Sequence, residues 1–209
     1  MFNEINEKQL SKEIEKVSEL IENGTLSELK PFIVPYFFND FSYTVDCPTK
    51  IWNSMRVAYI FNWNKKFSNM VSWDFVTNEK MQELGLDVDE IHQIAIENLN
   101  QMAVQYGNFI LDDKIPYYIL EFKERNVAPA FDSSTLLSNN ILEKLSRKLN
   151  SDKLYIFPLY QDFLFILKEE DLNISVKEVS KMLQELDYPY MGSLTKRIFS
   201  YSNGDISME

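Results

Sequence analysis

Side chains that bind metals or transfer protons gather in the run Asp87-Val-Asp89-Glu90-Ile-His92. Carboxylates and imidazole are ligands for hard or borderline cations, so a divalent metal site is one interpretation of this run. The other is a helix start, where acidic side chains cap free N–H groups and favour the helix dipole. The spacing does not match a calcium-binding loop. Because capping accounts for every acid in the run, the sequence predicts no metal site.

Three further aspartates could do acid–base work. Asp112 and Asp113 are adjacent in a predicted turn, and paired carboxylates act as acid and base where their surroundings separate their pKa values. Asp162 interrupts an apolar run between Phe157 and Phe163. Each also has a simpler interpretation, because aspartate is a routine turn former. We keep Asp112, Asp113 and Asp162 as candidate binding residues.

The chain has one cysteine, Cys47, and one histidine, His92. These counts exclude an intramolecular disulfide, a cysteine-rich zinc site and a zinc site with several histidines. A Cys47–His92 nucleophilic dyad needs the two side chains to be adjacent, and no catalytic signature surrounds Cys47. A packed, inert thiol is the alternative.

The glycine pattern excludes the common phosphate-binding loops. The five glycines are far apart, so neither a Walker A loop nor a dinucleotide-binding fingerprint is present. A Gly-x-Ser-x-Gly elbow is also missing. The sequence therefore predicts no cofactor and favours no enzyme class.

Charge narrows the choice of partner. The 209 residues include 21 basic and 32 acidic side chains, a net charge of -11. A general nucleic-acid binder carries the opposite sign, whereas an acidic surface attracts a basic protein. The N-terminus lacks a signal-peptide pattern, and no apolar run approaches the roughly 18 residues that span a bilayer. We expect a cytoplasmic protein that contacts neither nucleic acid nor membrane.

Hydrophobic periodicity predicts alternating hairpins and helices. Helices are expected at 4–22, 26–29, 78–84, 87–102, from Asp132 or Ser133 to Leu149, and at 175–187. Strands are expected at 55–61, 70–76, 116–122, 127–131, 153–157, 163–167 and 196–201. We expect the aromatic segment 31–48 to form a loop, because its prolines break regular structure. We expect the tail from Ser202 to have no regular structure.

This order predicts an α+β fold with a mostly antiparallel sheet built from hairpins and covered by several helices. We divide the chain into an N-terminal helical segment, 1–30, and a single α+β domain, 31–209.

Several segments resemble the YtpQ-like family of uncharacterised bacterial proteins, a domain of unknown function. The similar stretches are 56–60, 86–99 with its Ala-Ile-Glu-Asn-Leu end, 130–137 and 156–164, and 193–201 echoes the family's C-terminal segment. The resemblance covers roughly residues 50–200. The family has no established activity, so the resemblance implies no catalytic residue; Asn98, Asp132 and Asp162 are the polar positions that would mark a shared site.

Two functions remain open. One is a non-enzymatic protein-binding domain, such as an immunity-type protein that neutralises a basic toxin or another bacterial partner. The alternative is a small enzyme that uses carboxylates, with or without a divalent metal.

Overall fold

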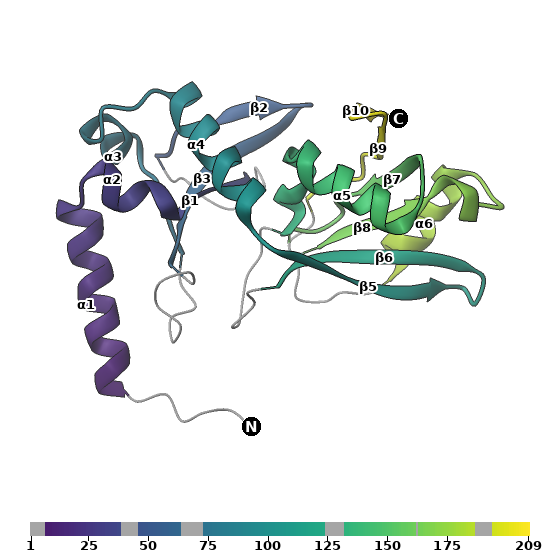
Figure 1. Ribbon diagram of the computed structural model, residues 1–209, viewed down its shortest axis with the longest axis horizontal. Helices are drawn as coiled ribbons and strands as arrows, with labels where there is room; N and C mark the ends of the chain where they lie inside the picture. Colours follow the sequence, from purple (N-terminus) through teal and green to yellow (C-terminus); the bar gives the residue numbers. More distant parts are fainter. Residues whose placement is uncertain (1–6, 39–45, 64–72, 124–131, 162, 187–193) are drawn as a thin grey trace.

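The computed structural model describes residues 7–38, 46–63, 73–123, 132–161, 163–186 and 194–209 (Figure 1). Candidate residue Asp162 and the predicted strand at 127–131 lie outside these ranges.

The N-terminal part of the chain forms an antiparallel sheet, sheet A, around a buried central strand. Strand β3 (Met55–Asn62) pairs with β1 (Ile33–Phe38) on one side. On its other side it pairs with β2 (Lys50–Trp52) at one end and with β4 (Trp73–Phe75) at the other. Helix α4 (Val88–Gln101) packs across β1 and β3.

The rest of the chain forms a six-stranded antiparallel sheet, sheet B, in the order β10-β9-β7-β8-β6-β5. Its strands are β5 (Val104–Leu111), β6 (Ile115–Phe122), β7 (Lys153–Phe157), β8 (Leu164–Lys168), β9 (Phe199–Ser202) and β10 (Asp205–Met208). With two antiparallel sheets and helices packed on them, the predicted α+β fold is confirmed.

Sheet B is covered on both faces. Leu164 and Ile166 of β8 belong to the same core as α5 (Asn139–Leu149), whereas Phe165 and Leu167 pack with α6 (Val176–Glu185). Successive strand side chains point to opposite faces, so a strand buried on both faces needs an unbroken apolar run. This explains why Phe163 to Leu167 contains no polar residue.

Aromatic stacking joins the two sheets. Trp52 of β2 stacks on Phe199 of β9, with ring centroids 5.3 Å apart, and Phe37 of β1 lies 6.0 Å from Trp52. The core that contains these side chains also contains Val17 of α1 (Glu7–Asn23) and Leu29 of α2 (Leu26–Leu29). One core therefore runs from the N-terminal helices to the last hairpin. The division at residue 30 stays a prediction.

Most of the residues that were predicted to begin or end a helix do so. Thr77 caps α3 (Asn78–Glu83), and Gly85 has the left-handed φ of +70° that ends it. Asp87 and Glu90 form the predicted capping box of α4. Ser175 caps α6.

The structure differs from the predicted elements in several places, and one of them is β2, which was not predicted. The segment 31–48 contains the strand β1; Pro35 is tolerated there because β1 is an edge strand. Residues 104–111 form β5, for which no strand was predicted. The helix that ends at Leu149 begins after Ser138, whereas Asp132–Leu137 is a 3₁₀ helix. The tail from Ser202 forms β10 through a turn at Asn203-Gly204.

We predict that both sheets unfold together. Phe199→Ala removes a fully buried ring that contacts both sheets, so it should lower the free energy of unfolding by about 3–5 kcal/mol. Urea denaturation followed by circular dichroism and by tryptophan fluorescence measures this. Two separate transitions in the wild-type protein would contradict a shared core.

Candidate functional site

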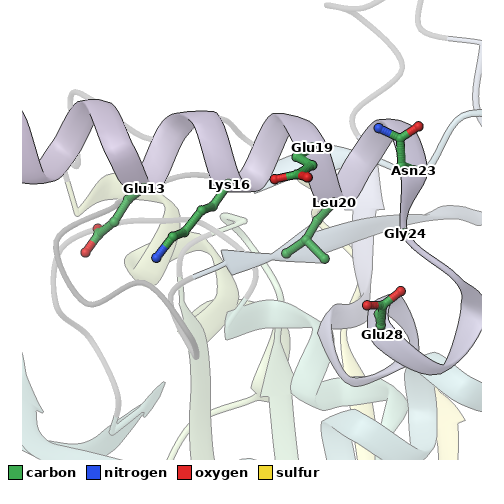
Figure 2. Close-up of a pocket in the computed structure, with 7 residues that line it drawn as sticks. All are labelled: Glu13, Lys16, Glu19, Leu20, Asn23, Gly24 and Glu28. Carbon is green, nitrogen blue, oxygen red and sulfur yellow. The ribbon is translucent and has the colours of Figure 1, made fainter.

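The first two helices enclose an open groove of about 670 Å³. Residues from both helices line it, namely Glu13, Lys16, Glu19, Leu20, Asn23, Gly24 and Glu28. Figure 2 shows Lys16 and Leu20 pointing from α1 toward the side where α2 lies, and Glu28 pointing from α2 back toward α1. The groove is thus formed by a helical hairpin at the edge of the molecule (Figure 1).

A glycine makes this hairpin possible. The N–H of Gly24 donates to the carbonyl of Leu20 at 2.9 Å. A Cβ on residue 24 would lie 2.4 Å from that same oxygen, so any side chain would push the chain away from α1. On the far side of the turn, the carboxylate of Glu28 accepts from the N–H and the hydroxyl of Thr25, at 2.9 and 2.7 Å. These contacts fix where α2 starts beside α1.

The groove is acidic with an apolar side chain among its charges. It contains three carboxylates, from Glu13, Glu19 and Glu28, against one ammonium from Lys16. Leu20 adds aliphatic surface. Lysine and arginine place a charged head on a long apolar stem, so such a groove accommodates both parts of either side chain. This groove was not predicted from the sequence, although the alternating Glu and Lys residues of α1 are visible there.

Asn98 joins α4 to the start of sheet A. Its side-chain amide donates to the carbonyls of Lys30 and Ile33, at 2.7 and 2.8 Å. The sequence could not separate this role from a binding role, because both require an amide on a half-buried helix face. A binding role for Asn98 stays a prediction.

Asp112 and Asp113 occupy the turn between β5 and β6. Both have left-handed φ angles, +49° and +54°, and the N–H of Lys114 donates to the carbonyl of Leu111 at 3.1 Å. Turns with two central left-handed residues favour Asn, Asp and Gly. The turn therefore explains these residue types, and the proposed binding role stays a prediction.

Asp132 is buried, with 3% of its surface exposed, in the 3₁₀ helix Asp132–Leu137, which contacts β1 of sheet A and β6 and β8 of sheet B. Its carboxylate accepts from the N–H of Phe122 at 3.1 Å, where β6 ends. The next residue, Ser133, donates its N–H to the carbonyl of Gln161, and the Gln161 amide donates to the carbonyl of Phe37. Asn98, Asp132 and the Asp112–Asp113 pair thus serve three separate parts of the fold.

His92 is half-buried and its Nδ1 lies 3.1 Å from the hydroxyl of Tyr59. Burial lowers the pKa of His92 below 6.5, the charge of Lys50 lowers it further, and Asp89 acts in the opposite direction. Lys50 itself donates to Asp89 at 2.8 Å. The imidazole is therefore neutral at pH 7.

Cys47 is a weak nucleophile in this environment. Burial raises the pKa of its thiol, Asp46 raises it further, and Arg56 acts in the opposite direction. A reactive cysteine needs a lowered pKa, because the thiolate is the nucleophile. The surroundings of Cys47 favour the packed, inert interpretation over the dyad with His92.

Among the described residues, no group of three or more His, Cys, Asp or Glu side chains is arranged to hold a metal ion. Within the same ranges, no helix is both long and apolar enough to cross a bilayer.

Comparison with protein-family models, with curated proteins and with solved structures finds no match. The resemblance to the YtpQ-like family therefore stays a prediction.

We predict that Asn98 stabilises the fold. Asn98→Ala should lower the free energy of unfolding by about 1–3 kcal/mol, because two carbonyls lose their donor. Asn98→Asp should cost more, because it puts a carboxylate oxygen beside both carbonyls. Gln93→Ala, an exposed amide on the same helix, is the control, with a change within about 0.5 kcal/mol. Equal losses for Ala at 98 and at 93 would disprove the role.

We predict that His92 titrates below 6.5 in the folded protein and that Lys50→Gln raises its pKa. As the pH falls, the unfolded state binds a proton at His92 at a higher pH than the folded state does. The contribution of His92 to the free energy of unfolding is therefore full above about pH 6.5. It is lost as the pH falls through the folded-state pKa. The protein has a single histidine, so one imidazole NMR signal reports the titration directly. Lys177→Gln is the distant control, and a folded pKa at or above 6.5 would refute the prediction.

Proposed function

We propose that this chain is a non-enzymatic protein-binding domain and that the α1–α2 groove holds a basic segment of its partner. An immunity-type protein that neutralises a basic bacterial toxin is the concrete form of this proposal. The observation that carries it is the groove itself, whose lining includes three carboxylates, one leucine and a single lysine.

Electrostatics supports a basic partner over a neutral one. The whole chain carries a net charge of -11, so its field attracts a cationic protein before contact. Inside the groove, Glu13, Glu19 and Glu28 exceed Lys16 by two negative charges. The net charge of the chain and the local charge of the groove are therefore both negative. Together they raise the rate at which a basic partner associates.

The shape of α1 supports a partner that lies along the helix. Its 17 residues span about 25 Å at 1.5 Å per residue. Val17 is buried in the core, but Ile14, one turn earlier on the same apolar stripe, is 48% exposed. Leu10, one turn further toward the N-terminus, packs against the core again, so Ile14 is an exposed apolar side chain on a helix that otherwise packs its apolar residues inward. A partner segment on this helix would gain apolar contact as well as charge pairing.

Lys16 gives the groove a pattern of charge and not a uniform negative patch. A cation of the partner opposite Lys16 would be repelled, whereas a cation opposite Glu19 would be attracted. Such repulsion against wrong alignments is a common source of specificity. The partner that fits best carries basic residues interrupted by an acidic or neutral one.

We predict that Glu19→Lys weakens partner binding on the order of tenfold, since lost attraction and new repulsion together amount to about 1.4 kcal/mol at an exposed site. Tagged protein is used to capture partners from the native organism at about 0.05 M and about 0.5 M salt, with mass spectrometry as the readout. A basic protein should be captured at low salt, lost at high salt and reduced by Glu19→Lys.

Glu185→Lys on α6 is the matched control, because it makes the same change in net charge at an exposed position outside the groove. Direct titration of the captured protein against the wild type and both variants then separates the groove from the overall charge. Equal weakening by the two variants would mean that net charge, and not the groove, determines binding. An empty capture would contradict the proposal.

A further inference from the structure

Strand β5 forms one edge of sheet B and, among the described residues, pairs only with β6. The N–H of Lys123 donates to the carbonyl of Ala103 at 2.9 Å, so Ala103 faces β6. Hydrogen-bonding direction alternates along an antiparallel strand. The backbone groups of Tyr106, Asn108 and Ile110 therefore point away from the sheet, along a strand of eight residues.

This edge lacks the features by which proteins protect open strands. Natural edges are short, or carry lysine, proline or a bulge. The sequence of β5, Val-Gln-Tyr-Gly-Asn-Phe-Ile-Leu, contains no charged residue and no proline. The opposite edge, β10, has four residues and begins with Asp205, and the edge strand β1 of sheet A contains Pro35.

Apolar side chains are exposed along β5. Ile110 is 66% exposed and Phe109 44%. The Phe109 ring stacks on Tyr117 at 5.5 Å and lies across Gly107, where a Cβ would come within 2.6 Å of the ring. Phe109 thus fills the space beside the glycine and leaves the edge even, as in the aromatic rescue of strand glycines.

We propose that β5 is a self-association edge: two copies of this chain pair β5 with β5, antiparallel, about a two-fold axis. An antiparallel strand is complementary to itself, which satisfies the symmetry of an isologous dimer. The pairing would join two six-stranded sheets into one continuous sheet.

The lack of charge on β5 suits a second copy of this chain better than a basic partner. Each chain carries a net charge of -11, so two copies repel wherever their acidic surfaces meet. The eight residues of β5 let two copies meet without placing like charges opposite each other. A basic partner, in contrast, finds no counter-charge on this strand. The edge and the acidic groove of α1 and α2 therefore suit different occupants.

Sedimentation velocity of the full chain tests this proposal. We expect the wild type to sediment as a dimer whose association does not weaken as salt rises, because no ion pair is needed. Ile110→Lys should give a monomer with an unchanged circular dichroism spectrum, since it places a charged side chain in each copy of a pairing strand that has none. Met208→Lys is the matched control, an exposed apolar residue on the opposite edge of sheet B, and should remain dimeric.

Asn108→Pro provides a second variant that keeps the hydrogen bonds to β6, because the N–H at 108 points outward. It should also be monomeric, whereas Asn108→Thr, which keeps that N–H, should remain a dimer. A wild-type protein that is monomeric at its highest soluble concentration would overturn the proposal. So would a dimer that survives both Ile110→Lys and Asn108→Pro, or a monomer that captures a strand of a different protein through β5.

Discussion

The stacking of Trp52 on Phe199 is the contact on which the remaining architecture depends. It joins two sheets that share no strand, and Phe199 is fully buried at that point. Once sheet B is fixed against sheet A, both of its faces need cover, because β7 and β8 carry large apolar side chains on each side. Helix α5 covers one face and α6 the other. The helices of the C-terminal half thus follow from the requirement to bury a two-faced sheet.

Local chemistry made the helices predictable. The capping box at Asp87 and a left-handed glycine at 85 act within a few residues of themselves. The tail shows a local signal that was overlooked: Asn203-Gly204 is a two-residue hairpin turn, and it creates β10. Asp112 and Asp113 were predicted as a turn or as a catalytic pair, and their left-handed angles explain the turn.

The features that could not be predicted from the sequence depend on tertiary contacts. Strand β5 contains Gly107 and Asn108, which disfavour a strand, and it forms because β6 provides a partner for all eight of its residues. Pro35 argued against β1 until its edge position was known. The acidic groove could not be predicted for the same reason. It arises from the close approach of Gly24 to Leu20, which the spacing of apolar residues does not indicate. Asn98 and Asp132 stood out as polar residues, but which carbonyl or N–H each one meets is decided by elements far along the chain.

The distance along the chain between Trp52 and Phe199 has a consequence for biosynthesis. A ribosome that has made sheet A has not yet made the ring that closes its core, and β9, the neighbour of β7, is also among the last strands to emerge. Contacts between such distant residues form slowly, because a long loop must close first. The nascent chain therefore carries exposed aromatic surface until Phe199 has been made. Synthesis of β9, more than that of any other single element, sets the earliest moment at which the shared core of the two sheets can close.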